Sequence, residues 1–62
     1  MYIVIHSKHD MDYREGMFAT YDEAKIARDK IANSIIFASR VWVDKVVADE
    51  EGNIVENLGS QE

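Results

Sequence analysis

Apolar and polar positions alternate in short blocks along the chain, and the blocks predict strands near both ends. Residues 2–7 are mostly β-branched and aromatic, which favours a strand. Residues 41–48 predict a second, stronger strand, and residues 54–58 predict a third. Between the last two, Gly52 can supply the positive φ of a hairpin loop at positions 49–53. The chain therefore predicts a strand at its start and a hairpin at its end.

The segment between these strands has the pattern of an amphipathic helix. Thr20 and Glu23 predict a capping box: Thr20 accepts a bond from the N–H of residue 23, and Glu23 reaches back to the N–H of Thr20. We expect the helix to run from Tyr21 to about Asn33, or as far as Ala38. Its expected buried stripe consists of Ala24, Ala27, Ile31 and Ile35.

These elements predict a small domain of mixed class. Residues 8–16 are polar and are expected to form a loop, while residues 17–19 fit either a short second strand or the approach to the helix. The expected fold is α+β, a two-layer β-(β)-α-β-β arrangement with one helix packed on a small, mainly antiparallel sheet. Residues 1–58 form the single predicted domain, and residues 59–62 are expected to be a frayed tail.

The strand at residues 41–48 does not alternate cleanly between apolar and polar positions. A bulge near Asp44–Lys45 would correct the alternation, and without it Lys45 would point toward the helix. With the bulge, one face of the strand carries Val41, Val43, Val46 and Ala48.

One helix covers only one side of such a sheet, so the other side is the expected interaction surface. Contiguous apolar patches usually mark interfaces, and Trp and Tyr are enriched among binding hot spots. We expect a second copy or a larger partner protein to cover this face; the alternative is that loop 8–16 folds over it with Met11, Tyr13 and Met17. The candidate interface residues are Tyr2, Val4, His6 and Trp42.

The charge is concentrated in the last third of the chain. The net charge is −5, residues 1–43 are balanced, and Lys45 is the one base after them. A chain without a basic stripe is not expected to bind nucleic acid directly. The acids either serve solubility or form a surface that fits a basic partner. The candidate acidic surface consists of Asp44, Asp49, Glu50, Glu51 and Glu56.

The length and composition restrict the class further. A chain of 62 residues buries only about 60% of its unfolded surface, and domains of this size often need a partner subunit. There is no cysteine and no apolar run near the roughly 18 residues that span a membrane, and the short apolar start without a basic region is not expected to be a secretory signal. We therefore expect a cytoplasmic protein that has no membrane partner.

The segment from His6 to Asp12 is the one stretch that could suggest chemistry. His6 and His9 have H-x-x-H spacing, and Asp10 and Asp12 could add oxygen ligands. Asp and His are also ordinary turn and strand-end residues, and this interpretation is preferred. No metal ligand, cofactor or catalytic residue is therefore expected.

The order of elements resembles that of the small tautomerases, which use an N-terminal proline as base. This chain contains no proline, and Met1 precedes Tyr2, so the tautomerase activity is not expected here.

Three functions follow, in order of preference. The first is a non-catalytic protein–protein interaction module that is homodimeric through the open sheet face. The second is an acidic regulator or inhibitor that occupies a basic or nucleic-acid-binding surface of a partner; its size and acidity are typical of small accessory proteins of bacteriophages. The third is a small metal protein or enzyme that uses the His6/His9 segment.

Overall fold

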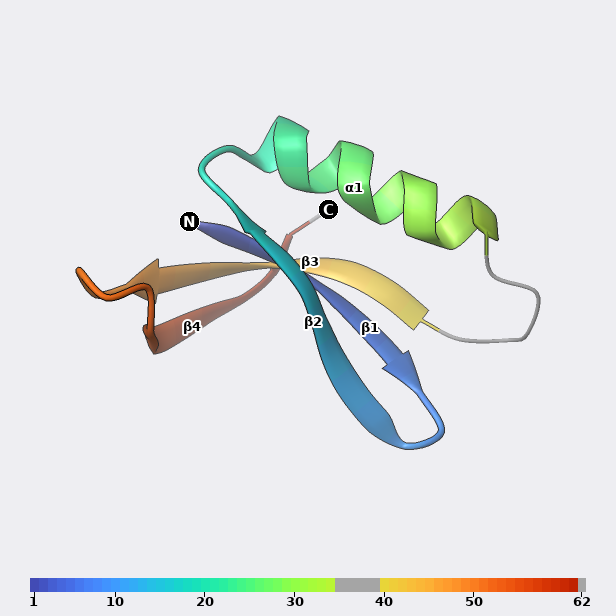
Figure 1. Ribbon diagram of the computed structural model, residues 1–62, viewed down its shortest axis with the longest axis horizontal. Helices are drawn as coiled ribbons and strands as arrows, with labels where there is room; N and C mark the ends of the chain where they lie inside the picture. Colours follow the sequence, from blue (N-terminus) through green and yellow to red (C-terminus); the bar gives the residue numbers. More distant parts are fainter. Residues whose placement is uncertain (35–39, 62) are drawn as a thin grey trace.

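One helix packs against one face of a four-stranded antiparallel sheet (Figure 1). The structure, a computed structural model, describes residues 1–34 and 40–61. The sheet order is β2-β1-β3-β4, so the two most apolar strands lie in the centre. This arrangement confirms the predicted α+β fold. The elements are β1 (Tyr2–Lys8), β2 (Met11–Phe18), α1 (Tyr21–Ser34), β3 (Arg40–Ala48) and β4 (Ile54–Gln61).

Strand β2 replaces most of the loop that the sequence predicted at residues 8–16. It pairs with β1 from Tyr2↔Phe18 to Lys8↔Met11. The connection is only His9 and Asp10, which have φ values of 52° and 63°. Positive φ at both central residues defines a type I′ turn, whose twist matches that of the flanking strands. The loop prediction was wrong because β2 is an edge strand without a buried residue, so its sequence stays polar.

The helix begins as the sequence predicts. The Thr20 hydroxyl oxygen accepts a bond from the Glu23 N–H (3.2 Å), and the same hydroxyl lies 3.0 Å from the Glu23 carboxylate, to which it donates. The carboxylate therefore reaches the cap hydroxyl rather than the backbone N–H of Thr20. Ala24 is fully buried, and Ala27 and Ile31 pack beside it, which confirms that part of the stripe. Ile35 and the extension to Ala38 lie outside the described residues.

The hairpin between β3 and β4 is also confirmed. Its loop, residues 49–53, closes with a 2.9 Å bond from the Asp49 N–H to the Asn53 carbonyl. Gly52 has a φ of 83°, a conformation that costs glycine little. The Asp49 carboxylate accepts bonds from the N–H groups of Glu51 (3.0 Å) and Asn53 (2.8 Å), so this acid shapes the loop.

Strand β4 continues through Gln61, and the expected frayed tail is wrong for residues 59–61. Ser60 pairs with Asp44, and Gln61 pairs with Val43. The strand extends past the apolar run because backbone pairing with β3 does not require apolar side chains. Glu62 lies outside the described residues.

The two faces of the sheet bury separate clusters. Under the helix, Val4, Ala24 and Val43 form one cluster. On the opposite face, Ile3, Ile5 and Val46 form the other. The partly buried residues around the first are Tyr2, Phe18, Tyr21, Ala27, Ile31 and Val41, and around the second are Trp42 and Ile54.

An irregularity does fall near Asp44–Lys45, in the pairing of β3 with β4, but it does not bring Val43 and Val46 to one face as predicted. Val43 lies in the helix-side cluster and Val46 in the other, so they do not share a face. Strand β3 pairs with β1 without interruption through Lys45↔Tyr2. The irregularities fall in the pairing with β4, where Asp44↔Ser60 is followed by Val46↔Asn57. Lys45 of β3 thus lies opposite two residues of β4, Leu58 and Gly59, which places the extra residue on the edge strand.

Candidate binding groove on the open sheet face

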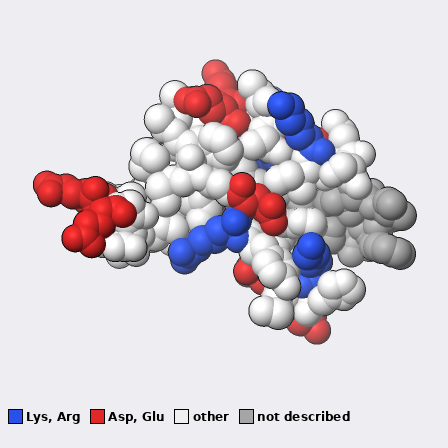
Figure 2. All heavy atoms as spheres, viewed as in Figure 1, with Lys and Arg blue, Asp and Glu red and all other residues white. Residues whose placement is uncertain are grey.

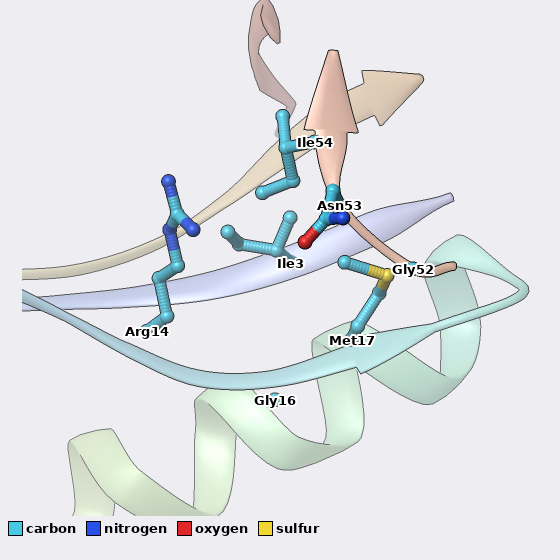
Figure 3. Close-up of a pocket in the computed structure, with 7 residues that line it drawn as sticks. All are labelled: Ile3, Arg14, Gly16, Met17, Gly52, Asn53 and Ile54. Atoms are coloured by element: carbon cyan, nitrogen blue, oxygen red, sulfur yellow. The ribbon is translucent and has the colours of Figure 1, made fainter. Parts of the chain in front are cut away.

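A hollow lies on the sheet face that the helix leaves uncovered. Figure 3 shows Ile3 of β1 between residues of β2 on one side and of the β3–β4 hairpin and β4 on the other. The twist of the sheet brings these outer segments toward each other over the central strands. The lining residues are Ile3, Arg14, Gly16, Met17, Gly52, Asn53 and Ile54.

A second hollow adjoins the first and extends along the same face. The two share Ile3, Arg14 and Ile54, so we treat them as one feature, called the groove. The second part adds residues from all four strands. They are Ile5 of β1, Asp12 of β2, Trp42 and Asp44 of β3, and Asn57 of β4.

The floor of the groove is already sequestered from water. Ile3 is 2% exposed and Val46 is 1% exposed, although no helix within residues 1–34 and 40–61 covers this side. Trp42 packs against that cluster but remains partly exposed. The Arg40 guanidinium carbon lies 5.4 Å from the centre of the Trp42 ring, a cation–π distance. Trp42 is the aromatic residue among those that line the groove.

The rim of the groove is polar and of mixed charge. Asp12 and Arg14 line it from β2, and Asp44 and Asn57 line it from the opposite side. The Asn57 side-chain amide donates a 2.9 Å bond to the Asp44 carboxylate. An apolar floor with a polar rim is the usual anatomy of a protein–protein contact.

The predicted interface residues are not brought together. Trp42 lies on the open face, but Tyr2 and Val4 pack under the helix, so their assignment to the open face was wrong. The register explains this result: Val4 pairs with Val43 and Ile5 pairs with Trp42, and paired residues share a face. Four consecutive apolar residues start β1, so the sequence alone did not indicate which alternate set faces the helix.

His6, the fourth predicted interface residue, also lies on the helix side. It pairs with Val41, which belongs to the helix-side cluster. Its Nδ1 atom lies 3.9 Å from a Glu15 carboxylate oxygen across the β1–β2 pair. The groove residues that sequence reasoning missed are mainly Arg14, Asn57 and Ile54, which lie on edge strands whose register was not predictable.

The predicted acidic surface is divided among three places. Asp49, Glu50 and Glu51 gather at the hairpin tip, where Figure 2 shows red acidic side chains at the left end of the molecule. Asp44 lines the groove instead. Glu56 pairs with Val47. Val46 packs against Ile3 on the groove side, so its neighbour Val47 and the paired Glu56 lie on the helix side of the sheet. The tip is the only dense group of acids among these five.

The segment from His6 to Asp12 is a hairpin and does not converge on a point. His6 belongs to β1, His9 and Asp10 make the turn, and Asp12 pairs with Ser7. Within residues 1–34 and 40–61, no three His, Asp or Glu side chains are grouped closely enough to hold a metal ion. Away from the groove, the adjacent Asp29 carboxylate raises the pKa of Arg28 by accepting its guanidinium hydrogen bonds.

Comparison with known family models, curated proteins and solved structures found no match to this chain. In the part of the chain that the structure describes, no helix has the length and apolar character to cross a membrane.

Proposed function

We propose that this protein is a non-catalytic protein–protein interaction module whose groove receives a projecting apolar side chain of a larger partner protein. The observation that carries the proposal is Trp42, which lies partly exposed beside a buried apolar floor. Trp is among the residue types most enriched at binding hot spots. We keep the cytoplasm as the proposed compartment, supported by the lack of cysteine.

The concave shape favours a foreign partner over a second copy at this site. A two-fold contact places the same surface patch of both copies against each other. Two identical hollows do not fill each other, so the groove is poorly suited to such a contact. A homodimer through the open face is therefore less well supported than docking of a partner that presents a convex segment.

A second candidate, an acidic regulator of a basic partner surface, is favoured by the hairpin tip. Asp49, Glu50 and Glu51 gather there, on an exposed loop. Exposed charges are screened by salt, whereas an apolar anchor is not. Binding that weakens steeply with salt would therefore support the tip, and binding that changes little would support the groove.

The experiment is a selection of displayed random peptides on the immobilised protein, with counter-selection on the variant Trp42→Ala. We expect enriched peptides to share one large apolar residue, and to weaken at least about tenfold on the variant, as hot-spot truncations do.

Two charge-reversal variants are compared: one in the groove, and one outside it that controls for a general effect of charge reversal on folding. Arg14→Glu changes the groove rim, and Lys25→Glu makes the same change on the exposed side of the helix. Binding should fall for Arg14→Glu and persist for Lys25→Glu. Peptides that bind all three variants as well as the wild type would overturn the proposal.

A further inference from the structure

The two edges of the sheet are built differently, and β4 is the less protected one. Within the described chain, β4 pairs only with β3, so its outer side presents backbone donors and acceptors to any added strand. Its Val55 and Leu58 side chains are 63% and 49% exposed. Glu56 is the single charged residue of the strand. An edge of this kind is a template for pairing with another chain.

The opposite edge, β2, carries the features that discourage strand addition. It contains Asp12, Arg14 and Glu15, and charged side chains are a common way of blocking an edge. The Lys8 ammonium lies 5.1 Å from the centre of the Tyr13 ring and covers one of the exposed aromatic groups. β2 also exposes Met11 (58%) and Met17 (36%), so the contrast between the edges is one of charge, with three charged residues in β2 against one in β4. The lower charge selects β4 as the edge that pairs.

We propose that β4 pairs antiparallel with β4 of a second copy, across a two-fold axis at Asn57. The proposal adds the outer edge of β4 as a second surface of the protein, and it meets the groove at Asn57, which also lines the groove. It joins two four-stranded sheets into one continuous sheet, with both grooves on the same side.

The register follows from the irregular pairing of β4 with β3. Ala48 pairs with Ile54 and Val46 pairs with Asn57, which leaves two residues of β4, Val55 and Glu56, opposite the single residue Val47 of β3. In the same way, Leu58 and Gly59 together occupy the place opposite Lys45.

A two-fold axis at Asn57 makes these two irregular segments opposite partners. It brings Val55 and Glu56 of one copy beside Leu58 and Gly59 of the other, twice over by symmetry. An axis perpendicular to the sheet keeps each face on its own side, so opposed positions must share a face. The two irregular segments do share a face, because they lie opposite Val47 and Lys45. These two residues are two positions apart on β3, so their side chains point to the same side of the sheet. In this register Val55 lies opposite Gly59 and Glu56 lies opposite Leu58, so the exposed Val55 and Leu58 occupy adjacent positions along the junction.

Charge also favours a second copy in the antiparallel direction. Antiparallel pairing sends the acidic tips to opposite ends of the junction, whereas parallel pairing would place them side by side. Lys45 of one copy lies two strands from Glu56 of the other, about 10 Å between backbones, which two long side chains can bridge. Both side chains are exposed in the single copy. The one base of the acidic third of the chain thus gains an acidic neighbour in the other copy.

The first test is the solution mass, measured by light scattering across a concentration series. We expect the wild type to be a dimer at micromolar concentration. Lys45→Glu and Glu56→Lys should each weaken the dimer by about tenfold or more, since each replaces two cross-copy attractions with repulsions. The double variant should restore it. Lys25→Glu, on the helix surface, should leave the mass unchanged.

Two results would overturn the proposal. One is a wild type that remains monomeric at every concentration. The other is a dimer that Lys45→Glu and Glu56→Lys affect no more than Lys25→Glu does. Circular dichroism of each variant shows whether the fold persists, and none of the three positions is buried.

A single cysteine at the axis gives a second readout that does not depend on affinity. The chain has no cysteine, so Asn57→Cys introduces the one thiol of each copy. Directly opposed antiparallel residues are about 4.5–5.5 Å apart between Cα atoms, within the range of a disulfide. We expect mild oxidation to link Asn57→Cys into a covalent dimer and to leave Glu51→Cys, at the tip, largely monomeric. Equal linking of both variants, or of neither, would contradict the axis.

Discussion

The two faces of the sheet bury their apolar residues by different means. On one face, helix α1 covers Val4 and Val43, both of which are 0% exposed. On the other face, Ile3, Ile5 and Val46 are almost as well buried, yet no helix in the described part of the chain lies above them. There residues of β2 and of the β3–β4 hairpin stand on either side of Ile3 and leave a groove (Figure 3). A second structural element closes the first cluster, and the twist of the sheet shelters the second.

From this difference between the two faces we propose that the helix-covered face serves stability and that the groove face serves binding. The helix covers the centre of the first cluster, and two of the partly exposed aromatic residues beside it, Tyr2 and Tyr21, pack edge to face on each other. The groove instead leaves Trp42 partly exposed in a hollow that Asp12, Arg14 and Asp44 also line. A partner can gain apolar contact in the groove without displacing any element of the fold. The face that is less completely covered is therefore the one that we assign to function.

The largest expected effect tests whether the groove floor is a real core. Ile3→Ala should lower the free energy of unfolding by about 3 kcal/mol, as large-to-small core substitutions do. Urea denaturation followed by far-UV circular dichroism measures it. If Ile3→Ala does not fold, Ile3→Val should cost about 1 kcal/mol. A loss near zero for either variant would mean that Ile3 is exposed in solution and that the two faces are not comparable.

The next effect concerns the helix-covered face alone. Thr20→Ala should cost about 1 kcal/mol, because the Glu23 N–H loses its cap acceptor. Thr20→Ser keeps the hydroxyl and should retain most of the stability. Denaturation curves of the two variants give the difference. Equal stability of both would show that the cap does not hold the helix start.

A smaller effect of opposite sign is expected at the β1–β2 turn. Asp10 has a φ of 63°, so Asp10→Gly should raise stability by about 0.5–1 kcal/mol by relieving left-handed strain. The thermal midpoint and the urea midpoint both report it. A matched Asp12→Gly change, within β2, should instead lower stability. A destabilised Asp10→Gly protein would contradict the type I′ turn.

The smallest effect sharpens the description of the groove. Arg40→Ala removes the cation beside Trp42 and should cost only about 0.5 kcal/mol. Trp42 is the single tryptophan, so its fluorescence can be assigned without ambiguity. We expect a red-shifted emission and faster acrylamide quenching in Arg40→Ala. Unchanged emission and quenching would mean that Arg40 does not cover the ring.

The sequence was informative where a local rule fixes the structure. The Thr20 cap of the Glu23 N–H, the stripe of Ala24, Ala27 and Ile31, and Gly52 in the hairpin loop were predicted correctly, whereas the Glu23 carboxylate accepts a bond from the Thr20 hydroxyl instead of from its N–H. Each depends on residues a few positions apart, whose geometry is set by the helix period or by a turn.

The face assignment failed because it depends on pairing between distant strands. Strand β1 begins with four apolar residues in succession, so only its register with β3 decides that Val4 faces the helix and Ile5 faces the groove. Strand β2 was missed for a related reason: it buries no residue, and its turn uses His9 and Asp10 instead of Asn and Gly. Arg14 and Asn57 were thereby absent from the predicted site.

The central claim, that the groove is the docking surface, is tested most directly by nuclear magnetic resonance of the isotope-labelled protein titrated with a selected peptide. We predict that the Trp42 indole N–H and the backbone amides of Arg14, Ile54 and Asn57 shift together and saturate at one affinity. The amides of the exposed helix positions Lys25, Asp29 and Ala32 should remain in place. Shifts confined to the helix or to the acidic tip at residues 49–51 would contradict the claim.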